Sequence, residues 1–114
     1  MNYMFSGCKS LTDINLSNFN TQNVNDMQYM FYNCNSIISL DLSNFNTQNI
    51  TNMRAMFNGC ESLTNLNLSN FNTQNVIYMN SMFFVCKSLT NLNLSNFILK
   101  MLLIWVKCFL IIFL

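Results

Sequence analysis

Histidine and proline are absent from this chain, glycine occurs only twice, and 8% of the residues are charged. Without histidine, the chain lacks a common metal ligand and the side chain that most often serves enzymes as general acid or base. The four acidic residues are Asp13, Asp26, Asp41 and Glu61, and no two of them stand at a helical or strand spacing. There is no glycine-rich phosphate loop and no Gly-x-Ser-x-Gly motif. The sequence therefore predicts no enzymatic activity, no catalytic residues, no cofactor and no metal site.

Positive charge is also sparse. Only Lys9, Arg54 and Lys87 precede the last seventeen residues, they lie far apart in the sequence, and the net charge is +1. Nucleic-acid binding requires clustered Lys and Arg to neutralise phosphates, so we expect no DNA or RNA partner. The residues that dominate instead, Asn, Ile, Phe, Leu and Met, favour codons rich in A and T, which indicates an AT-rich genome.

A unit of 26 residues is repeated along the chain. The string LSNFNTQN occupies 16–23, 42–49 and 68–75, and LSNF returns at 94–97. Apolar residues keep the same place in each unit, and no single-copy globular fold requires that register. Four such columns are Leu16, Leu42, Leu68 and Leu94; Leu11, Ile37, Leu63 and Leu89; Phe19, Phe45, Phe71 and Phe97; and Cys8, Cys34, Cys60 and Cys86.

Each unit has two parts. In Leu66-Asn67-Leu68, apolar and polar residues alternate, which predicts a short strand with one buried face. In the segment 23–34 (NVNDMQYMFYNC), apolar residues recur every three or four positions, which predicts a short helix. A lone unit buries too little apolar surface to fold, so the units must stack on one another. We therefore expect an α/β repeat fold, a solenoid with a parallel strand ladder and short helical returns.

The name of that fold comes from a resemblance. The stretch Leu11-x-x-Ile14-x-Leu16-x-x-Phe19 resembles the strand pattern of leucine-rich repeats, with Phe where many such repeats have Asn or Cys. The longer unit MFYNCNSIISLDLSNFNTQNIT is similar to the BspA-type leucine-rich repeats of bacterial and protozoan surface proteins. The resemblance covers residues 1–97 and implies that the expected fold is a leucine-rich-repeat solenoid. It implies a non-enzymatic parent protein, on the cell surface or secreted, that adheres to protein or glycan on host or neighbouring cells.

Residues 1–97 form the predicted repeat array, with a partial first unit and about four strands. Met1 falls in the column of Met27, so we expect the chain to begin within a unit, and the lack of a signal peptide then says little about location. Residues 98–114, the hydrophobic tail, are almost wholly apolar. Continuing the repeat after Phe97 and deleting one base reproduces the observed residues through Phe109. We interpret the tail as a frameshifted repeat.

Two other interpretations stay open. The hydrophobic tail is also a candidate membrane anchor, although its seventeen residues would span about 25 Å of a roughly 30 Å apolar core. Lys107 within it would cost about 2.5–3.5 kcal/mol, which the apolar neighbours can offset. Membrane contact through 98–114 would make this a small membrane-anchored repeat protein. The remaining interpretation is a non-functional, truncated and frameshifted gene remnant.

We interpret the cysteine and asparagine columns mainly as structural features. Each cysteine of the array ends an apolar stripe, so we expect four free thiols, mostly in the core. Disulfides between stacked units are the alternative. The asparagines at 18, 44, 70 and 96 and at 20, 46 and 72 are expected to form side-chain ladders that satisfy backbone groups of turns.

The candidate binding surface is the outward side of the predicted strands, which we call the strand face. Strand alternation turns a central row of polar side chains outward, and a flanking row runs beside it. Such a surface is polar and nearly uncharged, and it suits extended contacts with protein or glycan, with a plain solvated surface as the alternative. The central row is Asn15, Asp41, Asn67 and Asn93, and the flanking row is Asp13, Ser39, Asn65 and Asn91.

Overall fold

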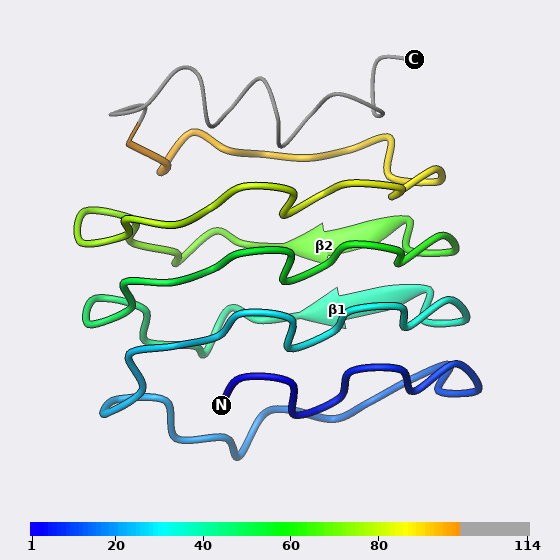
Figure 1. The fold of residues 1–114 in the computed structure, drawn as a ribbon, viewed down its shortest axis with the longest axis horizontal. Helices are drawn as coiled ribbons and strands as arrows, with labels where there is room; N and C mark the ends of the chain where they lie inside the picture. The colour runs from blue at the N-terminus through cyan, green and yellow to red at the C-terminus, as the bar shows by residue number, and fades with distance from the viewer. Residues whose placement is uncertain (99–114) are drawn as a thin grey trace.

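The computed structural model describes residues 1–98, in which the chain winds through successive layers that lie one above another (Figure 1). Two strands are formed, β1 at Ser39–Asp41 and β2 at Asn65–Asn67. Both have an exposed, a buried and an exposed residue in that order, as a strand with one covered face requires. The interpretations of the hydrophobic tail from residue 99 onward, as a frameshifted repeat or an anchor, lie outside the described residues.

Strand pairing follows the repeat of the sequence. β1 and β2 are parallel, and Leu40 pairs with Leu66 in their centre. One isolated parallel bridge joins Asn65 to Asn91 on the same side of the stack. Two more bridges join Asp26 to Asn52 and Asn52 to Tyr78. Each of these partners is one 26-residue unit away from the other, so equivalent positions of consecutive units lie side by side.

The segment predicted as a helical return differs from that prediction: residues 28–33 are turns, and residues 1–98 contain no helix. The backbone N–H groups of this segment alternate between two acceptors, a carbonyl of the next unit and a carbonyl three residues back in the same segment. Tyr29 and Phe31 donate to carbonyl oxygens of the next unit, each at 2.9 Å, whereas the N–H of Tyr32 donates to the Tyr29 carbonyl at 3.2 Å. A helix would direct every N–H to the residue four back. Hydrogen bonds between units therefore replace those of a helix.

This alternation requires left-handed backbone at two places in each unit. Residues other than glycine, asparagine and aspartate rarely adopt that conformation. At the second place, a side chain on Gly59 would collide with the Asn33 side chain of the preceding unit, which explains glycine there. The first column is Tyr3, Tyr29, Ala55 and Ser81, with φ from 51° to 60°; the second is Gly7, Asn33, Gly59 and Val85, with φ from 57° to 81°.

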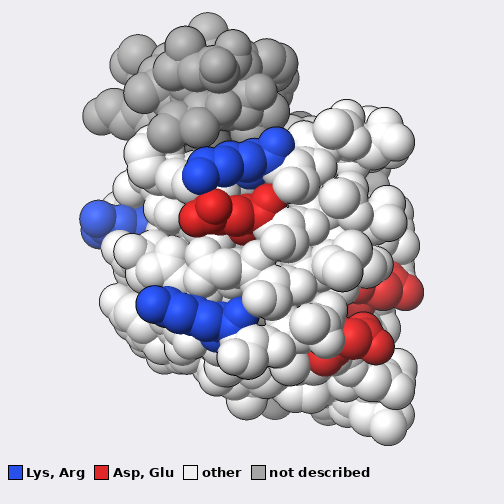
Figure 2. Space-filling model, turned by 90° about the vertical axis from the view of Figure 1, so that its right-hand side faces the viewer, with Lys and Arg blue, Asp and Glu red and all other residues white. Residues whose placement is uncertain are grey.

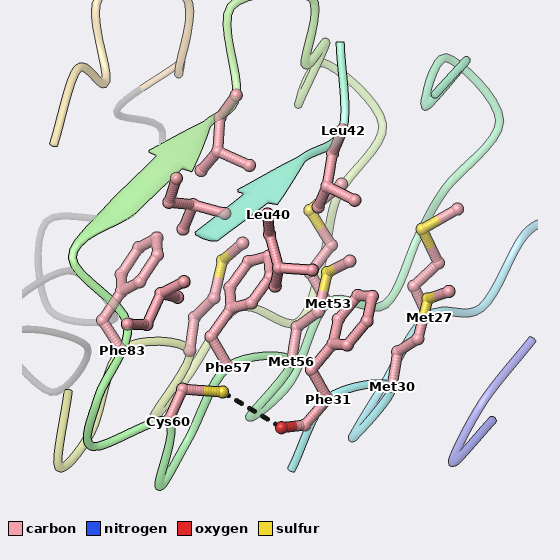
Figure 3. Packing of buried hydrophobic residues seen from close by; sticks show 14 of the residues in the cluster. Met27, Met30, Phe31, Leu40, Leu42, Met53, Met56, Phe57, Cys60 and Phe83 are labelled. Carbon is pink, nitrogen blue, oxygen red and sulfur yellow. Dashed lines mark hydrogen bonds between the residues drawn. The ribbon is translucent and has the colours of Figure 1, made fainter. Parts of the chain in front are cut away.

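The core lies between the strands and the returns, and it is continuous through the stack (Figure 3). Phe31, Phe57 and Phe83 stack on one another with ring centroids 5.8 Å apart at each step. Met53 and Met56 are wholly buried beside them. Because each side chain contacts the equivalent side chain of the next unit, the same residue type can occupy a column in every layer.

The first prediction concerns the left-handed column that ends at Val85. A β-branched residue is strained at its φ of 60°, so Val85→Gly should raise the free energy of unfolding by about 1 kcal/mol. Val85→Ala is the matched control, because it removes the branch and keeps the Cβ. Denaturant unfolding measures both. A Val85→Gly protein no more stable than Val85→Ala would show that the backbone strain is absent.

Candidate functional site

All eight side chains of the strand face are exposed in the structure. In the flanking row, Ser39 pairs with Asn65 within β1 and β2, and Asn65 pairs with Asn91 by the next bridge. In the central row, Asp41 pairs with Asn67, whose side-chain amide donates to the Asp41 carboxylate at 3.2 Å. The structure therefore places equivalent polar side chains of consecutive units beside one another.

The central row also has a structural role that the sequence analysis missed. The side-chain oxygen of each member accepts the backbone N–H of the serine two residues later, which fixes the turn after each strand. The signal in the sequence was Asn or Asp two positions before Ser. The four bonds are Ser17 to Asn15 at 3.0 Å, Ser43 to Asp41 at 3.0 Å, Ser69 to Asn67 at 3.1 Å and Ser95 to Asn93 at 3.0 Å.

Two depressions lie over the strand face. The larger, of about 380 Å³, is lined by Asp13, Ile14, Asn15, Leu16, Ser17, Asp41, Ser43 and Asn44. The smaller, of about 280 Å³, is lined by Ser39, Leu40, Asp41, Asn65, Leu66, Asn67 and Asn91. They share Asp41, so the two depressions adjoin each other across neighbouring units. Their polar groups are amides, hydroxyls and two carboxylates.

The electrostatics of the strand face are weakly negative. Hydrogen bonds from the Ser43 hydroxyl and N–H lower the pKa of Asp41, and the Asn67 amide acts in the same direction. Neither depression is lined by Lys or Arg. On another side of the molecule, acidic and basic side chains are few and dispersed as well (Figure 2). The cations Lys87 and Arg54 are engaged elsewhere, with Glu61 at 3.0 Å and with the ring of Tyr29 at 5.8 Å.

The repeat of the sequence is also recognised by comparison with known families. A family model described as "Mycoplasma protein of unknown function, DUF285" matches residues 1–109. The chain belongs to this family. The DUF285 match takes in the whole repeat array and the first part of the hydrophobic tail. No curated protein and no solved structure matches the chain.

Asparagine side chains of this DUF285 chain satisfy backbone groups of turns, as predicted, through bonds to the backbone rather than to one another. The amide of Asn44 donates to the carbonyl oxygens of Leu16 and Ser17 at 3.0 and 3.1 Å. Asn70 and Asn96 donate in the same way to Ser43 and Ser69. The column at 20, 46 and 72 accepts backbone N–H groups two residues later, at 2.9 to 3.1 Å. The asparagine columns thus satisfy turn backbone groups.

A threonine column performs a similar task inside the DUF285 fold, and it was not predicted. Thr21, Thr47 and Thr73 are at most 3% exposed. The hydroxyl of Thr47 donates to the Asn72 carbonyl at 3.1 Å and accepts the Asn72 N–H at 2.8 Å. Thr21 bonds Asn46 in the same way. One hydroxyl therefore satisfies both backbone groups of a residue in the next unit.

The cysteines at 8, 34, 60 and 86 are free thiols in the structure, and three are buried, whereas Cys8 is exposed. The thiol of Cys60 donates to the Phe31 carbonyl at 3.1 Å (Figure 3). Cys34 and Cys86 bond phenylalanine carbonyls at the same distance. Burial raises the pKa of Cys34 to about 11, with the nearby Cys8 adding to it, and burial raises the pKa of Cys86 to about 12. These thiols are core groups of low reactivity.

Metal binding and membrane crossing are two further possibilities for the described part of the chain. Residues 1–98 contain no group of three or more His, Cys, Asp or Glu side chains arranged to hold a metal ion. The same residues form no helix with the length and apolarity needed to cross a membrane. The functional proposal rests on the strand face, with its exposed polar rows and two depressions.

The second prediction tests the buried threonine hydroxyls. Thr47→Val keeps the shape of the side chain but leaves the N–H and carbonyl of Asn72 without a partner, which should cost about 1–3 kcal/mol of unfolding free energy. Thr47→Ser retains the hydroxyl and should lose much less. Chemical denaturation measures both variants. Equal losses in the two proteins would mean that the hydroxyl contributes nothing.

The third prediction concerns pH. A thiol whose pKa is raised by folding stabilises the protein fully below its unfolded value of 9.0, and that contribution is lost as pH rises. The free energy of unfolding should therefore fall between pH 9 and about 11 for Cys34. Urea unfolding at several pH values measures the slope. Because burial also raises the pKa of Cys60 and Cys86, Cys34→Ala should make the slope shallower without abolishing it, whatever its effect on stability at neutral pH; an unchanged slope would exclude this thiol as a contributor.

Proposed function

We propose that the chain is a fragment of a leucine-rich-repeat solenoid of the BspA type and acts as a non-enzymatic binding module. Parallel pairing between positions 26 residues apart supports the solenoid. So does the buried Leu40–Leu66 pair at the centre of the ladder. The returns of the chain are turns rather than helices. They are compatible with a solenoid, because consecutive units remain in register. The DUF285 description assigns no activity that opposes this.

The observation that carries the binding proposal is the exposed central row fixed at the turns. Each member is held by a bond to the serine N–H two residues later, so little side-chain freedom is lost when a ligand binds. Backbone groups of the units are largely engaged with one another. On the strand face, the hydrogen-bonding capacity left for a partner therefore resides in its polar side chains.

The partner we propose is a protein or glycan on the surface of host or neighbouring cells, met by a parent protein that is itself on a cell surface or secreted. The resemblance to BspA-type surface proteins supports this location. The weakly negative strand face gives no support to a nucleic-acid partner, because no cation lines its depressions. No enzymatic step is assigned to it.

The fourth prediction tests this function with the full chain immobilised on beads and applied to cells. In Asn65→Ala/Asn91→Ala, two exposed amides of the flanking row are lost without touching a turn. Loss of about 0.5–1.5 kcal/mol for each predicts a roughly 5- to 150-fold weaker binding. Asn23→Ala removes an exposed amide outside the strand face and is the matched control.

Treating the cells first with a protease or with glycosidases separates protein from glycan partners. Binding that the double variant retains at full strength would contradict a role for the strand face. Binding lost equally in Asn23→Ala would point to a general effect of removing asparagine. Thermal unfolding of each variant shows whether the array is intact before binding is compared.

A further inference from the structure

The strand face repeats the same chemistry at a short, regular interval. Ser39, Asn65 and Asn91 occupy one row because their backbones pair directly. Asp41 and Asn67 occupy the next row in the same register. Adjacent strands lie about 4.8 Å apart, so a polar side chain recurs at that interval along the stack. A ligand with the same period can make equivalent contacts at each unit.

We infer that the strand face binds a linear, uncharged, β-(1→4)-linked polysaccharide that runs across the strands along the axis of the stack. This deepens the proposed binding function and rests on it. The rise per sugar of an extended β-(1→4)-linked chain is close to the distance between strands, so successive sugars meet successive units. An extended polypeptide advances about 3.3 Å per residue and does not keep step with the units.

The charges of the face select among polysaccharides. Asp13 and Asp41 line the larger depression, and the hydrogen bonds around Asp41 keep its carboxylate ionised. Neither depression offers Lys or Arg to balance a carboxylate or sulfate on a ligand. Uronate-containing and sulfated glycans are therefore disfavoured. Neutral hexoses and N-acetylhexosamines present only hydroxyl and amide groups, which suit this surface.

The side chains also match the alternation of such a glycan. Successive sugars of a β-(1→4)-linked chain are turned over, so they present opposite edges to the protein. A carboxamide has both an acceptor oxygen and two N–H donors, so Asn65, Asn67 and Asn91 can bond either edge. The two depressions share Asp41, so together they lie over neighbouring units of the stack.

The fifth prediction uses calorimetry on the full chain with β-(1→4)-linked N-acetylglucosamine oligomers of increasing length. Affinity should rise roughly three- to tenfold with each added sugar, since each gains about one hydrogen bond, and it should level off at about four sugars. That limit corresponds to the four members of the central row, Asn15, Asp41, Asn67 and Asn93. Oligomers of α-(1→4)-linked glucose curl and should bind without this length dependence. Acidic β-(1→4)-linked mannuronate oligomers should bind at least about tenfold more weakly.

Variants place the glycan on the strand face. Asn65→Ala/Asn91→Ala should make the increase in affinity with length smaller, because the flanking row loses two amides while the central row stays intact, whereas Asn23→Ala should retain the full increase. Neither Asn65 nor Asn91 makes a side-chain hydrogen bond within residues 1–98, so the double variant should keep the stability of the parent chain. A titration curve of the acidic oligomer at high salt separates charge repulsion from poor fit.

Different failures have different meanings. Affinity that is independent of length, equal for α- and β-linked oligomers, or unchanged in the double variant would overturn the polysaccharide inference. If cells still bind through the strand face and a protease removes that binding, the proposed function stands with a protein as its partner. Absence of binding to both cells and oligomers would overturn the inference together with the proposed function.

Discussion

The hydrogen bond from one unit's backbone to the carbonyl of the next is the interaction on which the structure depends. In the returns, the N–H groups of Tyr29, Phe31 and Asn33 all reach across to the following unit, at 2.8 to 2.9 Å. Because these donors leave their own segment, the segment cannot close helical bonds and needs left-handed residues to redirect the chain. The short strands, the turns and the stacked aromatic core follow from this one requirement.

Side chains complete what the backbone leaves unsatisfied. Thr47 bonds both groups of Asn72, Asn44 covers the carbonyls of Leu16 and Ser17, and the thiol of Cys60 bonds the carbonyl of Phe31. These polar contacts are repeated in other units, and no buried side-chain nitrogen or oxygen within residues 1–98 lacks a partner. A chain with so few charges can therefore hold an ordered stack by neutral hydrogen bonds and apolar burial.

Much of this arrangement could be predicted from the columns of the sequence. The alternation around Leu40 and Leu66 indicated where strands would form, and the asparagine columns indicated which turns they would satisfy. The helical return could not be judged correctly, because apolar residues every three or four positions suit a helix and also a series of turns with alternate bonds to a neighbour. Only glycine and asparagine at 7, 33 and 59 hinted at left-handed backbone, and Tyr29, Ser81 and Val85 gave no such signal.

Strand alternation identified the candidate surface in the sequence, but it did not reveal that the central row also fixes turns. Alternation alone selected Asn15, Asp41, Asn67 and Asn93 as outward side chains, but not the bond that each accepts from a serine N–H. Such a residue fixes a turn and still presents an amide or carboxylate edge to solvent. This dual role means that a change at the central row tests folding and binding together, whereas Asn65 and Asn91 of the flanking row test binding more cleanly.

The contact between Asn33 and Gly59 has an evolutionary consequence. A larger residue at 59 requires a smaller one at 33, because their side-chain positions coincide across neighbouring layers. Substitutions in such a column are then accepted in pairs, one repeat apart, rather than singly. Each unit carries only one of the two partners, so duplicating the unit of Asn33 alone would set asparagine against asparagine, whereas duplicating it together with the unit of Gly59 preserves the pairing at this contact.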